Sequence, residues 1–183
     1  NMKILGIIGG MSPESTATYY TEINRLVNQK KGGNISAPIV MVSVEFEEIV
    51  QCQKQSEWQR AGEILAEAGK KLEMIGAEGI VLATNTMHKV APQIERALSI
   101  PFLHILDATA DAIKSRGLNK VALLGTKFTM SDNFYRDGLI VRGITPIVPN
   151  ESAQNEIHRI IFDELCVGKF LPQSKAFYLD TIE

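Results

Sequence analysis

Short runs of β-branched and aliphatic residues alternate along the chain with longer segments in which apolar residues recur at a helical period. This alternation is typical of a parallel sheet with helices on its faces. The apolar runs predict strands over residues 3–8, 39–44, 79–83, 101–105, 120–125 and 144–148. Long helices are expected to begin near Pro13, Glu57, Thr86, Asp107 and Ser131. The pattern therefore predicts an α/β fold.

The helical period is clear over residues 57–75. Apolar residues trace a single stripe along this segment: Trp58, Ala61, Ile64, Leu65, Ala68, Leu72 and Ile75. A helix with one apolar stripe buries that stripe and leaves its other face in water. We expect this segment to be a helix that packs on the core through these seven residues.

A weak internal repeat suggests two halves. Residues 3–9, KILGIIG, are echoed by residues 120–126, KVALLGT, which begin 117 positions later. If two similar βαβ halves are present, the counterpart of the junction at Ala83 would fall at roughly position 200. That position lies beyond Glu183, so we expect residues 1–100 to form one α/β half and residues 101–183 an incomplete second half. Alternatively, any two strands of an α/β protein are this similar.

Size and charge exclude several classes of protein. A chain of 183 residues with 45% hydrophobic content can bury a full core, as one domain or two small ones. The net charge of -2 leaves no basic field for a nucleic-acid partner. No apolar run reaches the roughly 18 residues that span a bilayer, and no signal peptide is recognisable at the N-terminus. We expect a cytoplasmic protein with no membrane partner.

The two cysteines, Cys52 and Cys166, are far apart in the sequence and have no C-x-x-C spacing. They predict neither a disulfide framework nor a metal site. We expect both to be small buried hydrophobic residues.

The turn after the first strand is rich in glycine. Residues 6–16 read GIIGGMSPEST, and backbone amides near the start of a helix can bind a carboxylate or phosphate. The spacing G-x-x-G-G differs from the dinucleotide fingerprint G-x-G-x-x-G, and no acidic residue ends the second strand, although Glu45 lies close. The turn favours a small-anion site. Glycines that only permit a tight turn, and a dinucleotide site, are the alternatives.

Three consecutive polar residues, Thr84, Asn85 and Thr86, follow the apolar run of the third strand. One of them can cap the next helix, but three exceed what a cap needs, so the junction predicts a binding site. His88, one turn further, is a candidate base. It is equally a candidate for an ordinary helix histidine, because its neighbours provide no orienting carboxylate.

Two further polar features have open interpretations. Glu45, Glu47, Glu48, Gln51 and Gln53 surround Cys52 in a stretch that predicts a solvated lid or helix face. Lys169 follows an apolar helical segment that contains Ile157, Ile160, Ile161 and Leu165. Its ammonium group either complements the dipole of that helix or pairs with a substrate carboxylate.

Four motifs together resemble the aspartate/glutamate racemase family, in particular its broad-specificity or L-selective branch. They are GGMS at 9–12, GAEG at 76–79, TNTMHK at 84–89 and ALLGT at 122–126. The resemblance extends over essentially the whole chain. It implies two pseudo-symmetric, Rossmann-like parallel-sheet halves with the active site between them, and a homodimer. It also implies an amino-acid substrate and no cofactor, whether pyridoxal phosphate, metal or nucleotide.

The resemblance implies a two-base reaction on aspartate or glutamate. In the family, one cysteine thiolate removes the α-proton and a second thiol returns a proton from the opposite face. The first of these positions is Ala83 here, and the second would lie beyond Glu183. By the same resemblance, the pocket would be lined by Met11, Gln53, Thr84, Asn85, Thr86 and Lys169. Asn85 and Thr86 would hold the α-carboxylate, with Lys169 or Gln53 nearer the other end.

The alanine at position 83 predicts an inactive chain. A methyl group cannot exchange protons, and the hydroxyl of Thr84 is too weakly acidic to replace a thiol. Neither cysteine of the chain lies at a predicted strand-to-helix junction. An inactivated racemase accounts for this pattern. A non-catalytic amino-acid binding module and a related isomerase or decarboxylase on the same scaffold are the alternatives.

Overall fold

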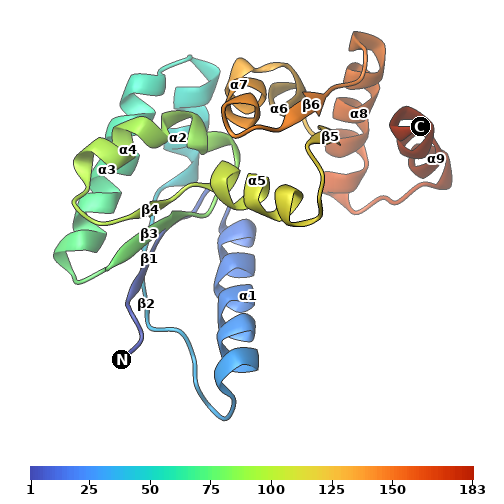
Figure 1. Ribbon diagram of the computed structural model, residues 1–183. Coiled ribbons are helices and arrows are strands. Elements are labelled where there is room, and N and C mark those ends of the chain that lie inside the picture. Colours follow the sequence, from blue (N-terminus) through green and yellow to red (C-terminus); the bar gives the residue numbers. More distant parts are fainter. The chain divides into compact units, whose positions relative to one another are not determined.

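The structure, a computed structural model, describes residues 1–183 and divides into two compact units (Figure 1). Unit 1 is Asn1–Ile105 and unit 2 is Leu106–Glu183. The boundary thus falls five residues after the division that the sequence suggested at 100/101. It lies next to the start of helix α5 (Ile105–Ser115), so that all of strand β4 belongs to unit 1.

Unit 1 contains a four-stranded parallel sheet in the order β2-β1-β3-β4. Its strands are β1 (Leu5–Gly9), β2 (Ile39–Ser43), β3 (Gly79–Leu82) and β4 (Phe102–Leu103). Leu5 pairs with Ile39 on one side and Gly79 on the other, which makes β1 a central strand. The predicted α/β fold with a parallel sheet is confirmed.

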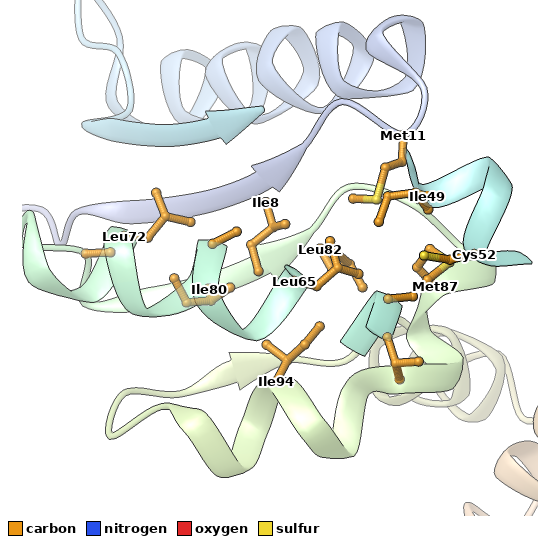
Figure 2. Close-up of a cluster of buried hydrophobic side chains, with 14 residues drawn as sticks. Ile8, Met11, Ile49, Cys52, Leu65, Leu72, Ile80, Leu82, Met87 and Ile94 are labelled. Atoms are coloured by element: carbon orange, nitrogen blue, oxygen red, sulfur yellow. The ribbon is translucent and has the colours of Figure 1, made fainter. Parts of the chain in front are cut away.

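Helices cover both faces of this sheet. They are α1 (Pro13–Lys31), α2 (Phe46–Lys54), α3 (Trp58–Met74) and α4 (Ala91–Ala97), with a 3-10 turn, η1 (Thr86–Val90), before α4. Figures 1 and 2 show α1 on one side of the sheet and α3 with α4 on the other. Pro13 and the side chain of Ser12, which accepts a hydrogen bond from Ser15 N, start α1.

The core of unit 1 lies between the sheet and helices α3 and α4 (Figure 2). Helix α3 contributes Ala61, Leu65, Ala68 and Leu72, all at most 3% exposed, and the sheet contributes Ile8, Ile80 and Leu82. Four of the seven stripe residues are therefore buried as predicted, and Trp58 and Ile64 are partly buried. The prediction for Ile75 is wrong. This residue is the C-cap of α3 and is 58% exposed, because the helix ends before the stripe returns to the core.

Two of the expected helices are interrupted. The helix expected from Thr86 is the short turn η1 followed by α4, because Pro92 has no N–H to continue a helical ladder and fits only the first turn of a new helix. The helix expected near Ser131 is two helices, α6 (Lys127–Ser131) and α7 (Asn133–Val141). Asp132 between them is extended and caps α7 through Phe134 N.

Unit 2 is built mainly from helices. Besides α5, α6 and α7 it contains β5 (Lys120–Ala122), β6 (Thr145–Ile147), α8 (Glu151–Asp163), the 3-10 turn η2 (Leu165–Val167) and α9 (Pro172–Ile182). Strands β5 and β6 pair in parallel, with Val121 opposite Pro146. Both expected strands of this unit are confirmed, although each is shorter than predicted.

A buried carboxylate joins the last elements of unit 2. Glu164 is 5% exposed and accepts hydrogen bonds from Ser174 of α9 and, at 2.8 Å, from Arg159 of α8. Its backbone carbonyl accepts from the amides of Val167 and Lys169. A buried carboxylate is tolerated when it is satisfied in this way.

The cysteines differ in environment. Cys52 of α2 is buried, as predicted, whereas the prediction for Cys166 is wrong, because η2 leaves it exposed. None of the helices combines the length and the apolar character needed to cross a bilayer.

Candidate functional site

The carboxyl ends of strands β1, β2 and β3 meet at one edge of the sheet in unit 1. Val44, just after β2, donates its N–H to the carbonyl of Gly9 at 2.9 Å. Ala83, just after β3, donates its N–H to the carbonyl of Ile8, also at 2.9 Å. Ligand sites of open parallel sheets lie at such strand ends. The sheet thus brings the glycine-rich turn next to the junction at Ala83.

Residues in the first turn of helix α1 hydrogen-bond to the glycine-rich turn. Gly10 N–H donates to Oγ1 of Thr16 at 2.8 Å, and that hydroxyl donates to the carbonyl of Ser12 at 2.9 Å. The amides of Ser15 and Thr16 also bond to Ser12. These amides are already satisfied inside the protein, so they are not available to an anion. The turn geometry favours the structural interpretation of the glycines.

Close contacts require glycine at positions 9 and 10 of the turn. Gly10 has φ +99°, and a Cβ there would lie 2.4 Å from the carbonyl oxygen of Val44. A Cβ on Gly9 would lie 2.5 Å from Cγ2 of Thr16. Real Cβ atoms do not approach neighbours this closely, and a positive φ of this size is rare outside glycine.

Ala83 is fully buried, and its backbone is held at both ends. Besides the bond from its N–H to Ile8, its carbonyl oxygen accepts a hydrogen bond from Ser15 Oγ at 3.0 Å. Neither bond involves the methyl group. The hydrogen bonds that hold this residue are therefore made by its backbone alone.

The polar residues after Ala83 are open to a ligand. Asn85 is exposed and precedes η1, but its side chain makes no capping hydrogen bond, so capping does not explain it. Thr84 and Thr86 are half-buried. The sequence allowed two roles for this junction, helix capping and ligand binding. The side chain of Asn85 does not cap the helix, so its amide group is available for binding.

His88 lies beneath this junction and is 1% exposed. Its Nδ1 is 2.7 Å from the carbonyl oxygen of Thr84, and its ring packs against those of His104 and Phe102, with centroids 4.9 and 5.8 Å away. Burial, with a smaller contribution from His104, lowers the pKa of His88 to about 4. The imidazole is therefore neutral at neutral pH.

The lowered pKa of His88 predicts a loss of stability in mild acid. Between pH 6.5 and about 4 the unfolded chain binds a proton at this residue and the folded chain does not. The free energy of unfolding of unit 1 should therefore fall as the pH is lowered through this range, by about 2–3 kcal/mol in total. Urea unfolding followed by the fluorescence of Trp58, the one tryptophan of the chain, measures it.

The control for that pH dependence is His88→Asn, which keeps a donor near Thr84 but has no ionisable ring. Its free energy of unfolding should depend less steeply on pH between 6.5 and 4.5 than that of the unaltered protein. Equal slopes in the two proteins would contradict the assignment.

The polar segment after β2 is helix α2, which places Gln53, one of the expected pocket residues, beside η1. Gln53 donates from Nε2 to the sulfur of Met87 at 3.1 Å. Ile49 and Cys52 face the core, which agrees with the helix-face interpretation. Glu45 caps this helix by accepting from the amides of Glu47 and Glu48, so its carboxylate is occupied and offers no support for a dinucleotide ribose.

The side chain of Met11 lies in the core. It is 4% exposed and packs in the cluster that contains Ile49, Cys52 and Met87 (Figure 2). Met11 therefore packs beneath the strand ends as part of the core, and its thioether does not face solvent.

Lys169 lies in unit 2, and its side chain is exposed. Helix α8 ends at Asp163, and the left-handed Gly168 (φ +76°) separates Lys169 from η2. The expectation that Lys169 follows directly on the helix of Ile157 and Leu165 is wrong, because Leu165 already belongs to η2. The carbonyl of Glu164, after the end of α8, accepts a hydrogen bond from the backbone amide of Lys169 at 2.8 Å and not from its ammonium group.

A cavity of about 600 Å³ lies elsewhere, in unit 2, lined mainly by apolar side chains of η2, α9 and their neighbours. None of its lining residues belongs to a strand. We assign the candidate site to the strand ends of unit 1, because the polar groups suited to an amino acid gather there. No group of three or more His, Cys, Asp or Glu side chains is arranged to hold a metal ion.

Similar proteins agree on one family. The family model for Asp/Glu/Hydantoin racemases matches residues 8–183. The broad specificity amino-acid racemase RacX of Bacillus subtilis (strain 168) is 25% identical over 160 residues, which are 86% of this chain and 69% of RacX.

Two crystal structures are similar over 99% of the chain. A proposed Asp/Glu racemase from Yersinia pestis is 48% identical with a TM-score of 0.96, and 79% of its chain is covered. PH1733, an aspartate racemase homologue from Pyrococcus horikoshii OT3, is 38% identical with a TM-score of 0.86, and 78% of its chain is covered. With a family model that matches nearly all of its residues and two such structural relatives, this chain belongs to the Asp/Glu/Hydantoin racemase family.

Proposed function

We propose that this chain binds aspartate or glutamate on a scaffold for racemisation without a cofactor, and that Ala83 leaves it without the first of two cysteine bases. Family membership supports a racemase, an isomerase, in general terms. The finer proposal rests chiefly on one observation. Ala83 is held by its backbone at the end of a central strand, and the uncommitted side chain of Asn85 follows two residues later.

The chemistry explains why one missing side chain matters. Racemisation breaks the Cα–H bond on one face of the substrate and forms a new Cα–H bond on the other. A thiolate takes the first proton and becomes a thiol, while the electron pair of the broken bond spreads into the α-carboxylate. A second acid, which the family pattern assigns to the other α/β half, delivers a proton to the opposite face. The methyl group of Ala83 can do neither step.

The polar residues receive roles in binding. We assign the α-carboxylate to Asn85 and Thr86, with Thr84 beside them, and the distal carboxylate to Gln53. Gln53 is supported by its contact with Met87, the neighbour of Thr86. Met11 supports this region from the core.

Calorimetric titration with L- and D-aspartate and L- and D-glutamate tests the proposal. We expect at least one of the four to bind with a Kd between about 1 μM and 1 mM, the usual range of enzyme–substrate affinity. Asn85→Ala should weaken that binding by about 10- to 150-fold, because a hydrogen bond to a charged group is worth about 1.5–3 kcal/mol.

The matched control is Asn34→Ala, at an exposed asparagine in the loop before β2. It should leave the affinity unchanged. The proposed function is wrong if none of the four amino acids binds, or if Asn85→Ala binds them as tightly as the unaltered protein does.

A further inference from the structure

His88 is a buried side chain that the racemase reaction does not use. A carbonyl oxygen can only accept a hydrogen bond, so the 2.7 Å contact with Thr84 requires the proton to be on Nδ1 of His88. The other ring nitrogen, Nε2, then carries a lone pair, and it is buried with no hydrogen-bond partner. The ring thus directs its N–H at the junction that we assign to substrate binding.

The cost of this arrangement indicates what the ring contributes. A buried acceptor without a partner lowers the free energy of unfolding, and a leucine of similar volume would avoid that loss. What leucine cannot supply is the donor to the carbonyl of Thr84. The imidazole is also held rigidly, because Phe102 and His104 pack against it.

The contact fixes the orientation of one peptide unit. In a planar trans peptide the C=O and the following N–H point in opposite directions. Because the carbonyl of Thr84 is held toward His88, the N–H of Asn85 points away from His88. The backbone N–H of His88 also donates to the carbonyl of Asn85 at 3.1 Å, so both ends of Asn85 are restrained by the same residue.

We propose that His88 is a positioning residue that locks the Thr84–Asn85 peptide and thereby presents the backbone N–H of Asn85 to the α-carboxylate of the substrate. The inference rests on the proposed function and adds to it a donor and the residue that aims this donor. His88 itself does not touch the substrate.

Two substitutions separate the donor from the bulk of the ring. The Nδ2 of asparagine lies two bonds from Cβ, as Nδ1 of histidine does, so His88→Asn keeps a donor for Thr84, whereas His88→Leu fills the space without one. Calorimetry should show that His88→Leu weakens the binding of L-aspartate about tenfold or more. The Kd of His88→Asn for L-aspartate should stay within about threefold of that of the unaltered protein. In this variant the N–H of Asn85 still donates a charge-assisted hydrogen bond to the α-carboxylate.

The amide proton of Asn85 gives a readout that a merely structural role would not move. In ¹⁵N–¹H spectra at saturating L-aspartate, this resonance should shift in the unaltered protein and in His88→Asn. It should not shift in His88→Leu, even where urea unfolding shows that this variant is folded.

The outcomes distinguish this inference from the proposed function. If the unaltered protein binds none of the four amino acids, the proposed function fails. If it binds one of the other three instead of L-aspartate, the same comparison is made with that amino acid. If it binds L-aspartate but the amide of Asn85 does not respond, or if His88→Leu binds as tightly as His88→Asn, the positioning role of His88 is wrong while the proposed function stands.

Discussion

Replacing Ala83 by cysteine is expected to start the exchange of the substrate α-hydrogen with solvent. In D₂O, the thiolate at position 83 should take the α-proton of one enantiomer of aspartate or glutamate, exchange it for deuterium, and return the deuteron to the same face. The rate should exceed that of the unaltered chain by at least about 10²-fold, the lower end of what a positioned base contributes. Proton NMR of the substrate Cα–H signal measures it directly.

This half-reaction does not depend on the second cysteine. Exchange at one enantiomer with retained configuration needs a single base, and conversion to the other enantiomer needs an acid on the opposite face as well. The rate should rise with pH up to about 8.5, the ordinary pKa of a thiol.

Ala83→Ser is the matched control for the exchange experiment. It adds a group of similar size whose hydroxyl is far less acidic than a thiol, and it should exchange no faster than the unaltered protein. Because the backbone of Ala83 makes both of its hydrogen bonds, neither substitution removes a hydrogen bond at the strand end. Binding without exchange in Ala83→Cys would contradict the two-base proposal.

Gly10→Ala is expected to destabilise unit 1 on the order of 4 kcal/mol. The positive φ of Gly10 costs an alanine about 1–2 kcal/mol. The added Cβ would also lie 2.4 Å from the carbonyl oxygen of Val44, so the end of β2 has to move and the bond from Val44 N to Gly9 is strained. Overpacking of this kind costs about 1–3 kcal/mol. Urea unfolding monitored at Trp58 measures the loss.

Gly32→Ala separates the two contributions. Gly32 follows α1 with φ +77°, and a Cβ there would meet nothing within 4 Å. Its ψ of 180° places it in a region that is essentially confined to glycine, so Gly32→Ala should show the conformational cost alone, about 1–3 kcal/mol. Equal losses in the two variants would mean that the contact between Gly10 and Val44 contributes nothing.

The strands of this fold could be predicted because each is a short apolar run bounded by turn residues. The helix boundaries were harder. Helix α2 has only Ile49 and Cys52 buried among charged residues, so its apolar face is too narrow to be distinguished from a solvated loop. Pro92 and Asp132 each signal a helix start, but long apolar segments around them favoured continuous helices.

The polar junction after Ala83 was predictable from the sequence, whereas the residues that pack against it and hydrogen-bond to it were not. Thr84, Asn85 and Thr86 are recognisable because three polar residues directly follow a buried strand. The environment of His88 depends on Phe102 and His104, which reach it only when β4 pairs beside β3. The hydrogen bond from Ser15 to Ala83 joins residues 68 positions apart, and no local pattern encodes it.

The backbone anchoring of Ala83 separates the hydrogen bonding at this position from the identity of its side chain. Since Ile8 and Ser15 bind only main-chain atoms at this position, the side chain of residue 83 can change without the loss of either hydrogen bond. On the proposed function, a single substitution at this position removes a proton-transfer group and leaves the strand end bonded as before.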